Sequence, residues 1–256
     1  MLLRVIAKML RISLEVQRAK DKALSKLIQK YDHRVGYGVF KGMLLGKNVH
    51  WSKNDKITQI LGVYEEHVLK KLQDFRNDGA DTFIDIGAAD GYFCVGFAYA
   101  DIFKHIWAYE ISQKGRDNIR ENAANNFCEN RLSVQSEANF QSINLALNKD
   151  KKAAILIDIE GGEYDLLDDN MLSLMSGNFI ICELHPWMRE DGYEHQSKLL
   201  ERAGIYFNIE IIDRNSYNPN KFEELFEFTD EERLIVLGEG RQKKMDWLVM
   251  TPLKNN

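Results

Sequence analysis

The stretch that decides the fold is Asp81-Thr-Phe-Ile-Asp-Ile-Gly-Ala-Ala-Asp-Gly-Tyr-Phe93. Residues 82–86 form an apolar run with β-branched and aromatic side chains, which is typical of a strand covered on both faces. Gly87 and Gly91 follow, and glycine permits backbone angles and close approaches that a Cβ would forbid. Residues 92–100 are apolar enough for a buried helix. The stretch therefore predicts a strand, a glycine turn and a helix whose first N–H groups face a nucleotide.

The spacing of the small residues indicates which nucleotide this turn would take. A dinucleotide site requires G-x-G-x-x-G, and counting from Gly87 the other two glycine positions hold Ala89 and Tyr92. An NAD-dependent oxidoreductase is therefore disfavoured. The order acid-x-Gly-x-Ala-x-Gly, led by Asp85, instead resembles the first motif of class I S-adenosylmethionine (SAM) methyltransferases, with Ala89 at the middle glycine position.

A second acid stands where such a site needs one. The short apolar run 106–109 ends in Glu110, about 20 residues after the glycine turn, where an acid at a strand tip bonds the ribose hydroxyls. Glu110 alone would fit a solvated strand end, but at this spacing it predicts a ribose contact. The resemblance further implies lead-in residues at the methionine end of SAM and a pair at the adenine. The implied cofactor contacts are Tyr64, Glu65, Asp85, Gly87, Ala88, Asp90, Gly91, Tyr92, Phe93, Glu110, Ile111, Glu137, Ala138 and Asp158.

The composition is that of an ordinary globular chain. It has 256 residues, of which 45% are hydrophobic and 29% charged, and this length suits one large α/β domain with an N-terminal addition. The net charge of −5 argues against general nucleic-acid binding. The 3 cysteines are scattered, so neither a zinc site nor a disulfide framework is indicated, and a reducing cytoplasm is predicted.

Residues 1–30 differ in charge from the rest of the chain. They hold eight basic and two acidic side chains, a net charge of +6 that leaves −11 for the remainder. Apolar residues recur at helical spacing, which predicts a basic amphipathic helix. Two roles are open: peripheral contact with an anionic inner membrane face, or docking on its own domain or on a second subunit of a homo-oligomer. Docking is favoured. The sequence contains no run of about 18 apolar residues, so no membrane-spanning segment is predicted. Basic residues also interrupt any apolar core of a signal peptide.

The remaining pattern alternates strands with helices. We predict a helical extension and lead-in over 1–50 and a SAM-dependent methyltransferase domain over 51–256. The domain is expected to be a Rossmann-like α/β fold with a seven-stranded, mostly parallel, doubly wound sheet. A helix is predicted over 194–203, and Gly204 is predicted to end it as a cap residue with a left-handed backbone. Thr229 and Glu232 predict a capping box that opens a later helix.

Two further strands are predicted to end in titratable groups. Asp158, Glu160 and Glu163 follow the buried run 153–157, and His185 follows the run 179–184. Carboxyl ends of strands line the crevice in which open α/β sheets bind ligands. Clustered carboxylates need a proton, a cation or a ligand to offset their charge. A helix-dipole role explains Glu163 but not Asp158. The candidate catalytic residues are Asp158, Glu160 and His185, and a divalent metal such as Mg²⁺ would take Asp158 and Glu160.

The glycine turn together with Asp158-Ile-Glu-Gly-Gly-Glu163 and Glu183-Leu-His-Pro186 resembles the FkbM-type branch of SAM methyltransferases. The resemblance covers roughly residues 80–190. It implies O-methylation of a hydroxyl on a sugar, a glycan or a related natural product. Two alternatives remain beside it: a SAM-dependent N-methyltransferase, and a non-catalytic SAM-binding partner module.

Overall fold

The computed structural model describes residues 2–46, 55–147, 151–214, 216–239, 241 and 243–253, with side chains from Leu14 onward. The chain divides into two compact units, and neither is continuous in sequence. The first unit comprises Met1–Tyr64 and Asn215–Lys243, and the second comprises Glu65–Arg214 and Lys244–Asn256. The boundary predicted between residues 50 and 51 lies outside the described residues.

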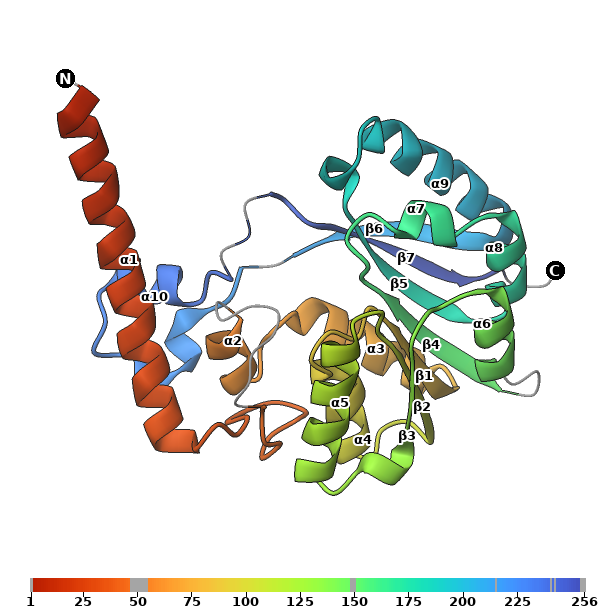
Figure 1. Cartoon of the computed structure of the whole chain (residues 1–256), viewed down its shortest axis with the longest axis horizontal. Helices are drawn as coiled ribbons and strands as arrows, with labels where there is room; N and C mark the ends of the chain where they lie inside the picture. Colours follow the sequence, from red (N-terminus) through yellow and green to blue (C-terminus); the bar gives the residue numbers. More distant parts are fainter. Residues whose placement is uncertain are drawn as a thin grey trace. The chain divides into compact units, whose positions relative to one another are not determined.

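The second unit is built on a seven-stranded sheet with the strand order β3-β2-β1-β4-β5-β7-β6 (Figure 1). Neighbours from β3 to β5 pair in parallel, while β7 lies between β5 and β6 and is antiparallel to both. This is the predicted seven-stranded, doubly wound sheet. The strands are β1 (Ala80–Ile86), β2 (His105–Tyr109), β3 (Leu132–Gln135), β4 (Lys152–Ile157), β5 (Phe179–Leu184), β6 (Phe207–Asp213) and β7 (Asp246–Pro252).

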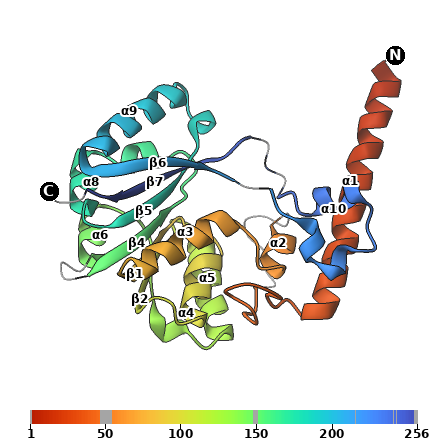
Figure 2. The ribbon, with the colours of Figure 1, turned by 180° about the vertical axis from the view of Figure 1, so that it is seen from behind.

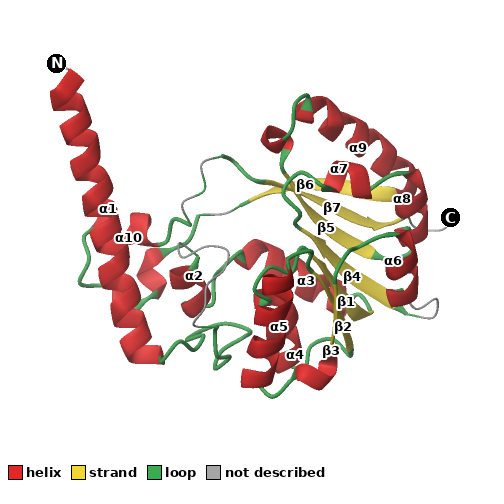
Figure 3. Cartoon of the chain, viewed as in Figure 1, coloured by secondary structure: helices red, strands yellow, loops and turns green. Residues whose placement is uncertain are grey.

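Helices cover both faces of this sheet (Figure 3). One face carries α3 (Glu66–Asn77), α4 (Tyr92–Tyr99) and α5 (Gln113–Asn125), and the other carries α6 (Phe140–Ala146), α7 (Glu163–Leu166), α8 (Asp169–Met175) and α9 (Gly192–Tyr206). Short 3₁₀ turns η1 (Glu129–Arg131) and η2 (Pro186–Met188) complete the unit. The central strands β1, β4 and β5 are buried on both faces, as their mainly apolar sequences require, and the acids Asp85 of β1 and Glu183 of β5 are buried with them.

One local expectation is wrong. Gly204 does not end a helix, because α9 continues to Tyr206 and Gly204 is not among the residues with positive φ. The helix ends where Phe207 turns extended, with a φ of −139°, and enters the core as the first residue of β6. Burial of an aromatic side chain therefore outweighs the weak stop signal of a glycine that a helix also tolerates.

The first unit is organised around the predicted N-terminal helix (Figure 2). Helix α1 packs against α2, α10 and η4. Its basic residues meet acids from the segment that follows β6: Lys26 Nζ lies 3.1 Å from Glu227 Oε1, and Lys30 Nζ lies 2.6 Å from Glu224 Oε1. The elements are α1 (Leu2–Tyr31), α2 (Lys56–Ile60), η3 (Pro219–Lys221), η4 (Glu223–Leu225) and α10 (Asp230–Val236).

These pairs bear on the role of the basic helix. Its C-terminal half docks within its own unit, which was the favoured alternative, and Thr229 and Glu232 form the predicted capping box of α10. In the part of the chain that the structure describes, no helix is long and apolar enough to cross a membrane.

Candidate active site

The glycine turn joins the ends of three neighbouring strands. The N–H groups of Gly87 and Ala88 both donate to the Tyr109 carbonyl at the end of β2, at 2.9 and 3.0 Å. Gly87 has a φ of +92°, and a Cβ on it would lie only 1.8 Å from the carbonyl oxygen of Asp158, just past β4. Glycine is therefore required at position 87 for both its backbone angle and its closeness to β4.

Glu110 lies beside this turn and organises it. Its Oε2 accepts the Ala89 N–H at 2.9 Å, and its Oε1 accepts the Ser112 N–H at 2.7 Å. Each carboxylate oxygen keeps a second lone pair, so the buried Glu110 can still accept two vicinal hydroxyls. Its chemistry therefore fits the ribose of SAM. Ile111, next in the chain, is 82% exposed and offers an apolar surface beside Glu110.

Gly115 is a residue of this region that the sequence did not single out. A Cβ on Gly115, in the first turn of α5, would lie 2.6 Å from Glu110 Cγ and 3.1 Å from the Ala89 carbonyl oxygen. The absence of a side chain there lets α5 start close against the acid. Only the spacing of Gly115 five positions after Glu110 could have signalled this contact.

Asp85 is sealed beneath the turn rather than open to it. The carboxyl group is buried in β1, and burial raises its pKa to about 7. A hydrogen bond with the Cys94 thiol opposes the shift, and the charge of Asp158 adds to it. Asp85 therefore holds its proton far more tightly than an ordinary aspartic acid.

The other predicted cofactor contacts differ in their surroundings. Asp90 is held to α5, because Asn118 Nδ2 donates to its Oδ1 at 2.9 Å and Asn122 Nδ2 donates to its carbonyl oxygen at 2.8 Å. Past β3, Glu137 is exposed and Ala138 is half-buried. Glu65 precedes α3 with a left-handed backbone, and Tyr64 belongs to the first unit. Gly91, Tyr92 and Phe93 form the start of α4.

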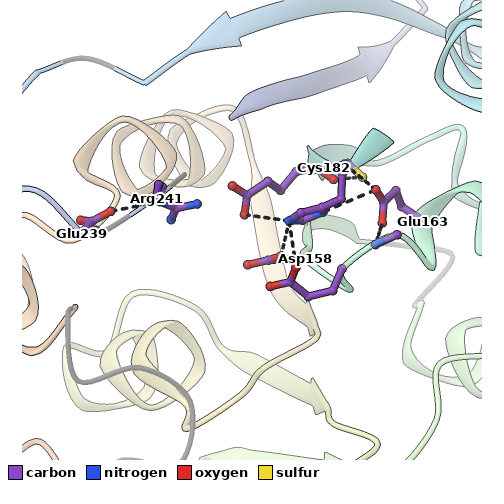
Figure 4. Close-up of polar contacts among 9 residues, drawn as sticks. Asp158, Glu163, Cys182, Glu239 and Arg241 are labelled. Carbon is purple, nitrogen blue, oxygen red and sulfur yellow. Dashed lines mark hydrogen bonds and ion pairs between the residues drawn. The ribbon is translucent and has the colours of Figure 1, made fainter. Parts of the chain in front are cut away.

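The second cluster includes Asp158 and Glu163 (Figure 4), and its acids surround His185. The imidazole follows β5 and is 1% exposed. Its Nε2 lies 3.6 Å from Asp158 Oδ1, 3.5 Å from Glu160 Oε2 and 3.7 Å from Glu183 Oε2. The sequence predicted that Asp158, Glu160 and His185 share one sheet edge, and the structure brings these three side chains together. It adds Glu183, to which the sequence gave no role.

Glu163 fixes the imidazole from the other side. Its Oε1 accepts the His185 backbone N–H at 2.8 Å and lies 3.4 Å from His185 Nδ1, while its Oε2 accepts the Gly161 N–H at 2.8 Å. Burial raises the pKa of Glu163, but hydrogen bonds from His185 outweigh it and the net pKa is lowered. Burial lowers the pKa of His185, and the bond to Glu163 with the nearby Asp158 charge reverses this to a net rise. His185 therefore favours the protonated state that balances these carboxylates.

One group among the described residues has the geometry of a metal site. One ligand atom each from Asp158, Glu183 and His185 lies within 4.8 Å of the others. Asp158 was a predicted ligand, whereas the other predicted ligand, Glu160, is outside this group. Glu160 is instead 44% exposed and has a φ of +52°. Two carboxylates and an imidazole fit a transition-metal ion such as Mn²⁺ better than Mg²⁺, which prefers oxygen ligands.

Comparison with known proteins adds to this geometry at the level of the fold. No protein-family model matches the chain, and no curated protein matches it in sequence. Among solved structures, cofactor-bound Rv0187 from MTB aligns with a TM-score of 0.50 and 11% identity, covering 91% of this chain and 91% of that chain.

Two O-methyltransferase structures align over similar lengths. The enzyme from Bacillus cereus in complex with SAH has a TM-score of 0.49 and 14% identity, covering 91% of each chain. TomG from Streptomyces achromogenes, involved in tomaymycin synthesis and solved with SAM, has a TM-score of 0.49 and 12% identity, covering 91% of this chain and 89% of that chain. The seven-stranded sheet and its flanking helices are those of the Rossmann-like SAM methyltransferase fold.

Proposed function

We propose that this chain is an FkbM-type SAM-dependent methyltransferase that methylates a hydroxyl group on a sugar, a glycan or a related natural product. One observation carries the proposal. The glycine turn, whose Ala89 N–H donates to Glu110, contacts the chain at the end of β4, because Gly87 packs directly against the Asp158 carbonyl. A cofactor on Glu110 and an acceptor beside Asp158 would therefore be neighbours.

SAM would supply a methyl group already activated as part of a sulfonium ion. The protein then has to hold the acceptor oxygen in line and to take up its proton. Asp158 and Glu160 have side chains that are 30% and 44% exposed, so either carboxylate can reach a bound acceptor. His185 is buried behind them and would act as a positioning residue that orients both carboxylates.

A divalent cation forms part of the proposal. Asp158, Glu183 and the imidazole of His185 in its deprotonated form would hold it, and its charge would replace that of the imidazolium in offsetting the two carboxylates. Glu183→Gln removes one ligand charge at a buried position. Activity that is lost after chelation and restored by Mn²⁺ in the native protein, but not in Glu183→Gln, would support the ion. Full activity in the presence of a chelator would contradict it.

The first test is calorimetric titration with S-adenosylhomocysteine. The native protein is expected to bind at micromolar dissociation constants, about −8 kcal/mol, and Glu110→Gln is expected to bind at least tenfold more weakly. Glu121→Gln on the exposed side of α5 is the matched control and should bind as the native protein does. Thermal melts of all three proteins separate lost contacts from lost folding. An absence of binding by the native protein would overturn the proposal.

Turnover on hydroxyl acceptors then distinguishes the remaining alternatives. Asp158→Asn keeps the size of the side chain and removes its charge, so it should retain S-adenosylhomocysteine binding and lose methyl transfer. Binding without transfer to any hydroxyl acceptor would point to an amine acceptor or to a non-catalytic SAM-binding module.

A further inference from the structure

Strand β6 forms one edge of the seven-stranded sheet in the second unit (Figures 1 and 3). It spans seven residues, Phe207–Asp213, and includes no proline, glycine or lysine. The opposite edge strand, β3, has only four residues. A long edge strand without proline or lysine offers a row of backbone donors and acceptors to another strand, and the two acids of β6, Glu210 and Asp213, are each paired with a lysine. The backbone of β6 is therefore suited to pairing with a further strand.

The apolar layer beneath α9 continues onto this edge. Ile209 and Ile211 pair with Met250 and Leu248 of β7, so they share a face with these fully buried core residues. The two isoleucines are nevertheless 41% and 44% exposed. The core thus ends in two β-branched apolar side chains that are only half covered.

We infer that β6 is the dimer interface of this protein, where it pairs antiparallel with β6 of a second copy across a twofold axis at Glu210. An axis at this residue overlaps all seven residues of both strands. It sets Ile209 opposite Ile211 of the partner subunit, and Ile211 opposite Ile209 of the partner subunit. The apolar layers of the two subunits then form one continuous layer. A twofold axis at Ile209 or at Ile211 would place only one of the two isoleucines opposite an isoleucine of the partner subunit.

The other face of β6 has charges that suit the same axis. Glu210 lies on the α3 face, and its Oε2 is 3.4 Å from Lys71 Nζ. The axis brings Glu210 next to Glu210 of the partner subunit, which is unfavourable for two bare carboxylates. Because each carboxylate comes with its own lysine, the four charges alternate around the axis. The surface is thus complementary to itself, as a closed twofold dimer requires.

The first test is the mass of the protein, measured by light scattering as it elutes from a size-exclusion column. The native chain is expected to elute as a dimer, at about twice its mass of 29.7 kDa. Ile211→Lys should shift it to monomer, whereas Ile211→Val should not. Leu145→Lys on α6 changes an even more exposed apolar residue and is expected to stay dimeric. A native protein that is monomeric throughout a dilution series would overturn the inference.

A cysteine at the axis tests the register. The three native cysteines are buried, so Glu210→Cys introduces an accessible thiol. Directly opposite residues in antiparallel strands have Cα atoms about 4.5–5.5 Å apart, within the range of a disulfide. Mild oxidation should link Glu210→Cys into a covalent dimer and leave the control Glu121→Cys unlinked. A dimer in which Glu210→Cys links no faster than Glu121→Cys uses another surface and contradicts the inference.

Discussion

Ala89 illustrates how one residue departs from the motif around it. It occupies the middle glycine position of the turn and adopts a φ of +48°. Left-handed backbone costs a residue with a Cβ about 1–2 kcal/mol, and glycine itself costs about 0.5–1 kcal/mol in lost chain entropy. We therefore expect Ala89→Gly to stabilise the protein by up to about 1 kcal/mol.

Urea denaturation measures this change. Ala88→Gly in the same turn is the control, because Ala88 is not among the residues with positive φ. That control is expected to destabilise the protein. Equal destabilisation by both substitutions would show that the turn in solution does not hold Ala89 in the left-handed region.

Asp85 makes stability depend on pH. Its pKa of about 7 in the folded protein exceeds the value of about 3.9 expected in the unfolded chain. The folded state thus binds the extra proton, and folding free energy is lost as pH rises from about 4 to about 7. Asp85→Asn removes this loss, on the order of 4 kcal/mol above pH 7.

Urea unfolding at pH 5 and pH 8 tests this sign. The gain from Asp85→Asn should be larger at pH 8. Asp81 on the same strand is the opposite case, because a hydrogen bond from Lys104 lowers its pKa. Asp81→Asn should therefore cost stability at both pH values and regain it only in acid. A pH-independent effect of Asp85→Asn would contradict the buried, protonated state.

At the scale of elements, helix α9 contains two glycines with opposite requirements. A Cβ on Gly204 would meet only Ile209 Cδ1, at 4.0 Å, whereas a Cβ on Gly192 would lie 1.8 Å from the Pro186 carbonyl oxygen. We expect Gly204→Ala to raise the free energy of unfolding by about 0.5–1 kcal/mol, because alanine reduces the freedom of the unfolded chain. Gly192→Ala should lower it. Chemical denaturation of both variants decides the point, and destabilisation by Gly204→Ala would contradict it.

The elements of the second unit could largely be predicted from sequence. Buried strands such as β4 and β5 are short, mainly apolar runs, and acids lie at or just past their carboxyl ends. Parallel order then brings Asp158 and His185 to one edge without knowledge of any loop. The role of Glu163 could not be predicted in this way. Its carboxylate bonds His185, 22 positions away, and only the path of the loop after β4 directs it there.

At the scale of the whole molecule, the pairing of α1 with residues 215–243 could not be predicted from the sequence. The two segments are far apart in the chain, and each alone is an ordinary charged stretch. Their contact centres on the buried Glu224, whose Oε1 accepts Lys30 Nζ at 2.6 Å and Tyr37 Oη at 3.0 Å and also accepts the Tyr31 hydroxyl. The spacing of apolar residues within each segment does not indicate such a contact.

Glu224→Gln should therefore weaken the first unit selectively. Losing charged hydrogen bonds in a buried cluster is expected to cost about 2–3 kcal/mol. Glu223→Gln is the matched control, because Glu223 also contacts Lys30 but is exposed, and its effect should be small. Hydrogen exchange can follow each unit separately. Equal protection of α1 in Glu224→Gln and the native protein would contradict the role of this cluster.

The position of β7 in the sheet has a consequence for how this protein folds during its synthesis on the ribosome. Domains generally fold in order as the chain emerges, the N-terminal part first. Here β7 follows all other strands in the chain but lies between β5 and β6, and α1 waits for a segment that emerges after β6. Until β7 has been synthesised, β5 and β6 each lack the strand that will pair with one of their edges. Nascent chains of this protein therefore expose one edge of β5 and one edge of β6 during the last part of their synthesis, and we expect chaperones to engage them at that stage.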